Sequence, residues 1–436
     1  MLAHSATVPT LTHLMIPYEQ LDAWVDAHFD QQVAFLQALV RMPSDTPPGN
    51  NAPHADLTAS LLEGLGLAAE KFPVPDAEVR AAGLQSITNL LVRRHYGPGR
   101  TLLLNAHGDV VPPGEGWSRD PYGGEIEDGK LYGRAAAVSK SDFSTYTFAV
   151  LALEAVARPQ TGSVELLFTY DEEFGGELGP AWLLRHNIIK PDLMIAAGFS
   201  YQVITAHNGC LQLEGTVNGR MAHAAIPASG VDALQAAVRI LGTLYAQNDL
   251  YQHISSQVEG IGHPYLNVGQ IEGGTNTNVV PGRVVFKLDR RMIPEEKPAE
   301  VEAMLRVIIA EAAAQIPGVV VDVRRLLLAN AMRPMPGNQP LVEALQRHAE
   351  AIFAEPIPAL GTPLYTDVRL FCEAGIPGVI YGAGPRTVLE SRAKQADERL
   401  DLADLRRATK VIARSLADLL VYPPAEGPGQ TGQPVR

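Results

Sequence analysis

The chain is organised around the stretch TLLLNAHGDVV, residues 101–111. Its apolar run, residues 102–104, is typical of a buried strand in a parallel sheet. The polar triplet His107-Gly108-Asp109 follows at the carboxyl end of that strand, where open α/β sheets carry their ligand sites. His107 and Asp109 are two residues apart, so on extended backbone they face the same side, and the carboxylate can orient the imidazole. These residues alone are equally compatible with a structural histidine near an aspartate.

A second apolar strand, residues 163–169, is also followed by charged residues. Asp171, Glu172 and Glu173 follow it, and two glycines come directly after Phe174. Two adjacent carboxylates on a surface helix would need no explanation. At the end of a buried strand and before a double glycine, they give independent support for a functional site.

Length and composition limit the class of protein. With 436 residues, the chain exceeds what one hydrophobic core usually serves, so two domains are expected. The net charge of −13 is spread along the chain, which argues against nucleic acid and anionic membranes as partners. The two cysteines, Cys210 and Cys372, lie far apart and indicate a reducing compartment, and neither a signal peptide nor a membrane span is recognisable. A cytoplasmic enzyme is the expectation.

Hydrophobic periodicity predicts an α/β domain that a second domain interrupts. In the first half of the chain we expect helices over residues 18–40, 55–65 and 143–157, and strands over 86–94, 101–105, 163–169 and 192–197. The Gly- and Pro-rich stretch 111–142 is expected to be a long functional loop.

From about residue 209 the pattern changes to alternating strands. We expect two strand–helix–strand units on an antiparallel sheet, with strands over 211–217, 266–271, 283–291 and 318–327 and helices over 231–247 and 299–314. The α/β pattern resumes at residue 339 and closes with a helix over 402–420. The Pro- and Gly-rich residues 423–436 are expected to be a disordered tail.

The order of motifs resembles one family, the di-zinc amidohydrolases and metallopeptidases that include aminoacylases, carboxypeptidase G, acetylornithine deacetylase and succinyl-diaminopimelate desuccinylase. The matching stretches, spread over residues 18–421, are HGDVV, YDEEFGG, MAHAAIPASGVDA, GGTNTNVVPG, KLDRRMIP, YTDVRLF and GIPGVIYGAG. The resemblance implies a zinc-peptidase-like, three-layer α/β catalytic domain in two parts, residues 1–209 and 330–422. It also implies an inserted ferredoxin-like α+β lid, residues 210–329, that forms a homodimer contact.

The resemblance assigns roles by position at the two strand ends. His107 would bind one metal ion with Asp109 orienting it, and Glu173 would bind the other. Glu172 would be the general base that takes a proton from metal-bound water.

The substrate-holding side of the family's site is retained. His223 in the lid would reach a partner's active site and help to stabilise the oxyanion. Asn276, Asn278 and Arg291 would hold the substrate's carboxylate, for which a guanidinium offers a planar fork, and the turn at Gly384 would close the pocket. The resemblance thus implies a small carboxylate-bearing substrate.

Three of the family's five metal ligands are missing. Val138 stands where the bridging aspartate is expected, Gly198 where a carboxylate is expected, and Lys394 where a histidine is expected. The remaining ligands are His107 and Glu173, whereas a zinc site ordinarily needs three or four protein ligands. No tightly held cofactor is therefore expected, and a weak or single zinc or manganese ion stays open.

The replacements indicate a rebuilt site. Lys394 brings a fixed positive charge to a place where the family holds a cation, and it is the expected partner of Glu173, because buried carboxylates need one. An exposed lysine at a helix start is the alternative. Recruitment of His207 as a new ligand is the remaining way to keep a metal.

Three functions stay open at this stage. The first is an aminoacylase- or carboxypeptidase-like amidohydrolase that works with few or no metal ions. The second is a metal-free isomerase, epimerase or lyase in which Glu172 abstracts a proton and Lys394 or His223 acts as the acid or electrophile. The third is a non-catalytic protein that binds small carboxylates in the old pocket.

Overall fold

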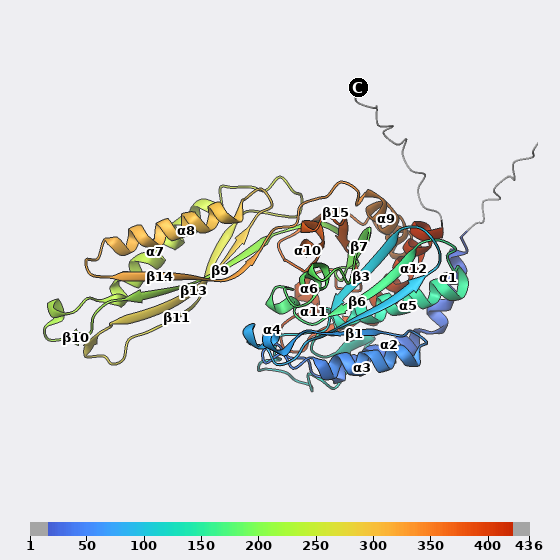
Figure 1. Ribbon diagram of the computed structural model, residues 1–436, viewed down its shortest axis with the longest axis horizontal. Helices are drawn as coiled ribbons and strands as arrows, with labels where there is room; N and C mark the ends of the chain where they lie inside the picture. The colour runs from blue at the N-terminus through green and yellow to red at the C-terminus, as the bar shows by residue number, and fades with distance from the viewer. Residues whose placement is uncertain (1–15, 422–436) are drawn as a thin grey trace, which may run out of the picture.

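The computed structural model describes residues 16–421, so the tail expected over residues 423–436 lies outside the described part of the chain. The described residues form a larger body on an eight-stranded sheet and a smaller body that projects from it (Figure 1). Each body has its own hydrophobic core. The smaller body is an insertion between two halves of the larger one, and it is called the lid below.

The sheet of the larger body contains the strand that residues 101–107 form. Its strand order is β1-β2-β6-β3-β7-β16-β8-β15. The strands are β1 (Glu70–Pro73), β2 (Thr88–His95), β3 (Thr101–His107), β6 (Ser163–Thr169), β7 (Leu193–Ala196), β8 (Val203–His207), β15 (Ala359–Thr362) and β16 (Gly378–Ile380). β3 runs parallel to β6 on one side and to β7 on the other, and every residue after Thr101 is buried. This central position explains an apolar run without alternation.

Helices cover this sheet and pack on one another. They are α1 (Tyr18–Ala27), α2 (Phe29–Arg41), α3 (Ala52–Gly64), α4 (Asp76–Ala81), α5 (Lys140–Val156), α6 (Pro180–Arg185), α9 (Gln339–Phe353), α10 (Val368–Glu373), α11 (Val388–Ser391) and α12 (Leu402–Val421). α5 contacts β3 and β6, and both α2 and α12 pack against it. The N-terminal and C-terminal segments of the chain therefore close over the same helix.

The single helix expected over residues 18–40 is two helices, α1 and α2, so that prediction was wrong. The break lies at His28, whose Nδ1 is 2.8 Å from the carbonyl oxygen of Trp24. The ring of His28 also stacks on that of Trp24, with ring centroids 3.8 Å apart. These local side-chain contacts end α1, and apolar periodicity does not report them.

The long loop expected over residues 111–142 contains a hairpin. Its strands are β4 (Glu125–Glu127) and β5 (Lys130–Tyr132), and β17 (Arg399–Asp401) pairs with β5. Asp128 and Gly129 form the turn with positive φ angles of 49° and 71°, as a two-residue hairpin turn requires. The hairpin therefore fastens this loop to the segment that follows Lys394.

The lid is a four-stranded antiparallel sheet with the order β11-β13-β9-β14, covered by two helices that contact each other. Its elements are β9 (Gly209–Asn218), α7 (Ala233–Tyr251), β11 (Tyr265–Gly273), β13 (Arg283–Met292), α8 (Pro298–Ala314) and β14 (Val320–Ala329). Residues of β9 and β13 alternate between buried and partly exposed, the pattern of a sheet covered on one face. A short pair, β10 (Ala222–His223) and β12 (Val279–Val280), forms at the far tip of the lid (Figure 1).

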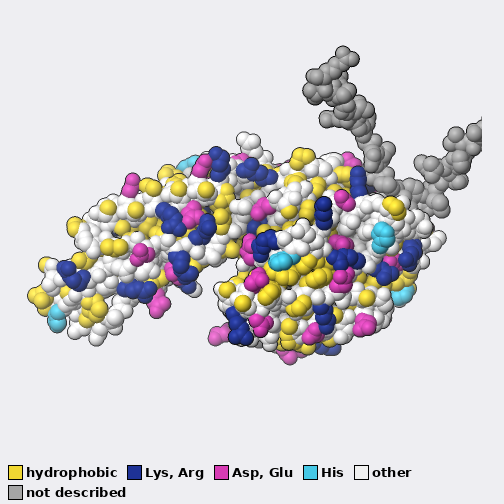
Figure 2. Space-filling view, in the orientation of Figure 1, with side chains coloured by type: hydrophobic (Ala, Val, Ile, Leu, Met, Phe, Trp, Pro, Cys, Tyr) yellow, Lys and Arg dark blue, Asp and Glu magenta, His cyan; other side chains and the backbone are white. Residues whose placement is uncertain are grey.

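The surface carries both signs of charge. On the face seen in Figure 2, basic and acidic side chains are interspersed over both bodies. Within residues 16–421, every helix is too short or too polar to span a membrane.

Candidate active site

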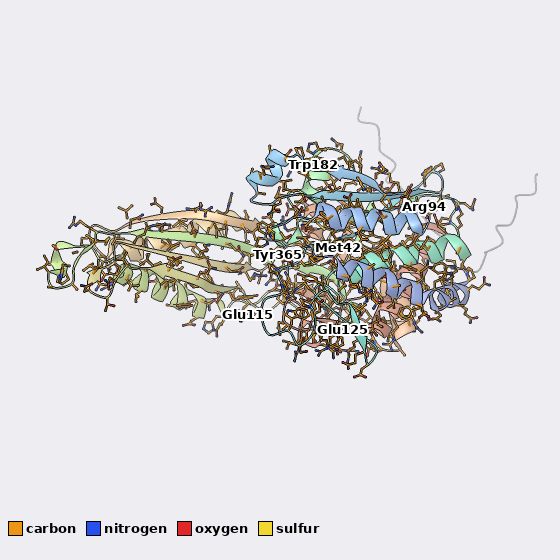
Figure 3. All side chains as sticks on the ribbon, turned by 90° about the horizontal axis from the view of Figure 1, so that it is seen from below. Met42, Arg94, Glu115, Glu125, Trp182 and Tyr365 are labelled. Atoms are coloured by element: carbon orange, nitrogen blue, oxygen red, sulfur yellow. The ribbon has the colours of Figure 1, made fainter. Side chains whose placement is uncertain are left out.

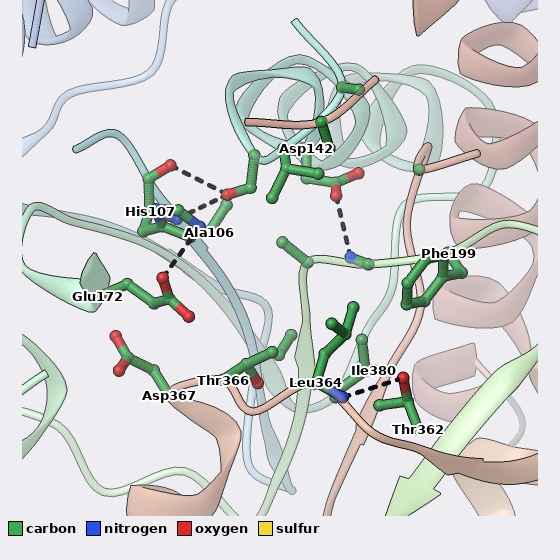
Figure 4. Close-up of a pocket in the computed structure, with 18 of the residues that line it drawn as sticks. Ala106, His107, Asp142, Glu172, Phe199, Thr362, Leu364, Thr366, Asp367 and Ile380 are labelled. Atoms are coloured by element: carbon green, nitrogen blue, oxygen red, sulfur yellow. Dashed lines mark hydrogen bonds and ion pairs between the residues drawn. The ribbon is translucent and has the colours of Figure 1, made fainter. Parts of the chain in front are cut away.

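A pocket lies at the carboxyl ends of β3, β6 and β7. Its volume is about 280 Å³, and its lining includes the predicted residues His107, Glu172, Gly384 and Lys394 together with Arg291 of the lid (Figure 4). The register of β3 and β6 sets His107 opposite Thr169, so the residues that follow each strand share this edge of the sheet. The two strand-end clusters seen in the sequence are thus brought together.

His107 lies between two carboxylates. Its Nδ1 is 3.0 Å from the backbone oxygen of Asp109 and 3.4 Å from Oδ1 of the same residue. Its Nε2 faces the Glu172 carboxylate, with 3.7 Å between Nε2 and Oε2. Asp109 also accepts a hydrogen bond of 2.9 Å from the backbone N–H of Glu173. Asp109 therefore connects the two clusters as well as lying beside the imidazole.

The charges of these groups depend on one another. Burial alone would lower the pKa of His107, but Glu172, Asp109 and Glu173 outweigh burial and raise the pKa to about 10. Burial raises the pKa of Glu172, and His107 opposes that rise. The pair is therefore an imidazolium facing a carboxylate that burial makes more basic than usual.

Lys394 forms the expected ion pair with Glu173, with 2.6 Å between Nζ and Oε2. The Lys394 side chain is 53% exposed, whereas that of Glu173 is 10% exposed, so the ammonium closes over the carboxylate from the solvent side. Burial lowers the pKa of Lys394, but Glu173 and Glu172 raise it by more, and the ammonium stays charged. The residue follows α11 and has a left-handed backbone, φ 63°, so it does not begin a helix.

Two buried carboxylates, Glu398 and Asp142, anchor the segments that carry residues 138, 198 and 394. The sequence patterns pointed to neither of them. Glu398 accepts hydrogen bonds from Arg134 Nη1 (2.7 Å), from the Ala137 N–H (3.2 Å) and from the Lys394 N–H (3.3 Å). It thus clamps the segment that directly precedes Val138 to the segment at Lys394. Its position four residues after Lys394 is the one sequence signal that could have drawn attention to it.

Asp142, at the start of α5, is the second anchor. Its carboxylate accepts hydrogen bonds from the Gly198 N–H (3.1 Å) and the Ala383 N–H (2.7 Å). Burial raises the pKa of Asp142 to about 7, and the two backbone donors counteract that rise. Each segment that lacks an expected metal ligand is therefore held by a buried acid.

Arg291 is the lid residue that reaches the pocket. Its Nε donates a 2.7 Å hydrogen bond to Asp289 Oδ1, and its guanidinium lies 5.4 Å from the centroid of the Tyr365 ring. Tyr365 lies where the lid strands meet the larger body (Figure 3). These contacts fix the direction of the guanidinium at the junction of the two bodies.

His223, Asn276 and Asn278 lie elsewhere. All three are exposed, and the Ala224 N–H donates to the Asn278 carbonyl oxygen at 3.0 Å beside the β10–β12 pair. This pair lies at the end of the lid farthest from β3 (Figure 1). One chain therefore does not bring these three residues to the pocket that Arg291 enters.

His207 is used within the fold. Its Nδ1 lies 2.8 Å from the Asn208 carbonyl oxygen, and its Nε2 accepts a 3.5 Å hydrogen bond from the Thr366 N–H. Burial lowers the pKa of His207 to about 4. Both ring nitrogens thus have protein partners, which argues against its recruitment as a metal ligand.

A mixed α/β body with an acid/base pair at the sheet edge and an inserted lid defines a zinc-peptidase-like hydrolase. The profile described as Peptidase family M20/M25/M40 matches residues 103–418, and the chain belongs to this family. The family consists of hydrolases that act on amide bonds, and it generally depends on two zinc ions.

Relatives and solved structures agree with this assignment. The succinyl-diaminopimelate desuccinylase of Methylobacterium sp. (strain 4-46) is 30% identical over 416 residues, 91% of this chain and 97% of the relative. The acetylornithine deacetylase of Edwardsiella ictaluri (strain 93-146) is 29% identical over 339 residues, 73% of this chain and 84% of the relative. The fold matches the metallo-carboxypeptidase Sso-CP2 of Sulfolobus solfataricus with a TM-score of 0.72 at 20% identity, covering 89% of this chain and 98% of that one. It matches the dipeptidase Dug1p of Saccharomyces cerevisiae with a TM-score of 0.75 at 14% identity, covering 93% and 98%.

The donor atoms in the pocket do not fit the family's two zinc ions. Val138 and Gly198 offer no side-chain ligand, and the ammonium of Lys394 already pairs with Oε2 of Glu173 at 2.6 Å. Within residues 16–421, no three His, Cys, Asp or Glu side chains are grouped so that they could hold a metal ion. A zinc site ordinarily takes three or four such ligands.

The Arg134–Glu398 pair yields a prediction about stability. Both side chains are 2% exposed, so Glu398→Gln leaves a buried guanidinium without its counter-charge and should lower the free energy of unfolding by about 3–5 kcal/mol. The matched control, Glu177→Gln, removes an exposed partner of Arg185 and should change it by less than about 1 kcal/mol. Urea denaturation measures both, and equal effects would contradict the clamp.

Proposed function

We propose that the protein hydrolyses the amide bond of a small substrate with a free carboxylate, such as an N-acyl amino acid, without two bound zinc ions. The observation that carries this proposal is that Glu172 shares one pocket with two fixed cations, Lys394 and Arg291. A base, a positive charge for the developing oxyanion and a guanidinium for a carboxylate are the groups that such a reaction requires.

Glu172 is the proposed general base. It follows β6 in a short 3₁₀ turn (Glu172–Phe174), is 9% exposed and faces the cavity. Its carboxylate takes a proton from a water molecule as the water oxygen bonds to the amide carbon. The proton then passes to the amide nitrogen as the C–N bond breaks, which yields a carboxylic acid and an amine. Burial makes this carboxylate a stronger base than one in water.

Lys394 is the proposed source of positive charge. Its ammonium lies over Glu173 at the mouth of the pocket, and the Glu398 carboxylate holds its backbone N–H. A fixed ammonium stabilises the negative oxygen that forms when water adds to the amide carbon. It also neutralises Glu173, which would otherwise repel that oxygen.

Arg291 is the proposed carboxylate binder. Asp289 accepts a hydrogen bond from Nε of Arg291. This geometry leaves the two terminal nitrogens of the guanidinium for a planar, two-point contact with a ligand carboxylate. The Tyr365 ring beside the guanidinium limits its movement.

His223, Asn276 and Asn278 are proposed to act in the pocket of a partner within a homodimer. Their exposure and their distance from the pocket of their own chain support a role in trans. Met221 and Ile226 beside His223 are 55% and 62% exposed, which favours a protein contact at the tip of the lid.

Substitution of Glu172 tests the proposed base. Glu172→Gln keeps the shape but loses proton transfer, so kcat for amine release from N-acyl amino acids should fall about 10²–10⁴-fold. Glu177→Gln, a nearby exposed glutamate paired with Arg185, should leave kcat unchanged.

The amine-release assay, run in deuterated solvent, distinguishes hydrolysis from a second candidate function, which is proton transfer without hydrolysis. This candidate is favoured by a buried Glu172 in a pocket whose donor set does not fit the family's metal ions. Entry of solvent deuterium α to the carboxylate, without amine release and dependent on Glu172, would identify it and contradict the hydrolase. A ligand that binds but undergoes neither reaction would identify a binding protein.

Removal of metal ions tests whether the protein is active without bound zinc. Activity and melting temperature should be unchanged by a chelator, and elemental analysis should find less than one zinc per chain.

Substitution of Lys394 tests the proposed source of positive charge. Lys394→Ala should lower kcat about 10²–10³-fold, because the oxyanion loses its cation and Glu173 is left unpaired. Lys394→Arg should retain more activity than Lys394→Ala. Full activity of Lys394→Ala with zinc added would refute the proposal.

Mixing of two inactive variants tests the homodimer. In the proposed dimer, a Glu172→Gln subunit supplies His223 to the intact Glu172 of a His223→Ala subunit. Random reassociation should therefore restore about a quarter of wild-type activity, since half of the dimers are mixed and each has one complete site. Each variant reassociated with itself is the control, and failure of the mixture to regain activity would place His223 outside the partner's site.

A further inference from the structure

Charged side chains gather at one end of the pocket, whereas apolar side chains predominate, together with Thr362, at the other. In Figure 4, His107, Glu172 and Asp367 lie at one end, and Phe199, Leu364 and Ile380 lie at the other. Val138 and Val388 also belong to the lining. Five of the larger apolar residues of this lining are called the apolar compartment below: Val138, Phe199, Leu364, Ile380 and Val388.

Two positions of the altered metal site contribute to this compartment. Val138 presents an isopropyl group where the family's bridging carboxylate is expected. At Gly198, an added Cβ would meet Ile380 Cγ2 at 2.1 Å, so Ile380 occupies the room that a side chain at position 198 would need. Two positions at which the family's metal ligands are expected, 138 and 198, thus border apolar surface of the pocket.

Much of this wall contacts solvent. Ile380 is only 1% exposed, but Leu364 is 37% exposed, and Val138, Phe199 and Val388 are half-buried. Apolar surface inside a concave pocket favours a ligand group that removes it from water. A subsite that had to hold a polar or charged group would need donors or counter-charges in place of these side chains.

We propose that the apolar compartment binds an aliphatic acyl chain of the substrate, with the amide carbonyl turned toward Glu172. This inference rests on the proposed function and adds the substrate class: N-acyl amino acids with acyl chains longer than acetyl. An anionic acyl group such as succinyl is disfavoured, because the five side chains of the apolar compartment offer its carboxylate neither a hydrogen-bond donor nor a counter-charge.

A series of N-acyl derivatives of one amino acid tests the inference. The acyl groups are acetyl, butanoyl, hexanoyl and succinyl. For the wild type, kcat/KM is measured. For Glu172→Gln, which should turn the ligands over about 10²–10⁴-fold more slowly, the dissociation constant is measured by calorimetry. Each added methylene should raise kcat/KM and lower the dissociation constant about fourfold until the pocket is filled. Among the groups longer than acetyl, succinyl should give the lowest kcat/KM and the weakest binding.

Val388→Asp should reduce the advantage of hexanoyl over acetyl at least about tenfold, because it places a carboxylate in the compartment. Leu389→Asp is the matched control. Leu389 is the next residue on α11 but is 80% exposed and absent from the lining, so this variant should keep the wild-type ratio.

The outcomes separate the two proposals. Binding to Glu172→Gln that improves with chain length, without hydrolysis by the wild type, would support the compartment and overturn the proposed hydrolysis. Hydrolysis with equal kcat/KM for all chain lengths would overturn the compartment and leave the hydrolase standing. An unchanged hexanoyl-to-acetyl ratio in Val388→Asp would also overturn the compartment.

Discussion

A carboxylate that leaves water must find a positive charge or a hydrogen-bond donor, and the pocket of this protein is built around that requirement. Glu173 meets the ammonium of Lys394, and Glu172 faces His107. Asp142 and Glu398 accept backbone N–H groups from the segments around the pocket. In a family that generally relies on two zinc ions, these acids are satisfied by the chain itself.

The two bodies of the molecule divide the work of shaping the pocket. The register of β3 and β6 fixes the relative positions of the acid/base residues on buried strands, where packing leaves little freedom. The lid has its own core and contributes Arg291, which Asp289 and Tyr365 hold at the junction. The base therefore belongs to one body and the guanidinium to the other, so the width of the pocket depends on how the two bodies meet.

Most long periodic elements could be predicted from the sequence, whereas several short ones could not. The buried strand at 163–169 and the alternating strands of the lid lie where the pattern indicated, because each carries enough residues to show its period. β15 and β16 have four and three residues, too few for any period, and their pairing with β8 and β7 is set by distant chain segments. The Asp128-Gly129 turn was a readable hairpin signal that periodicity alone does not use.

The sequence by itself determined which chemical groups are available. The residue identities at positions 138, 198 and 394, the presence of Glu172 and Arg291, and the charge of Lys394 are properties of the sequence, which no folding can alter. Only the tertiary structure decided where these groups meet. The contact of Ile380 with Gly198, the clamp made by Glu398 and the position of His223 at the tip of the lid each join, or separate, segments that are remote in the chain. Such contacts follow from the packing of whole elements against one another, and no local pattern of residues encodes them.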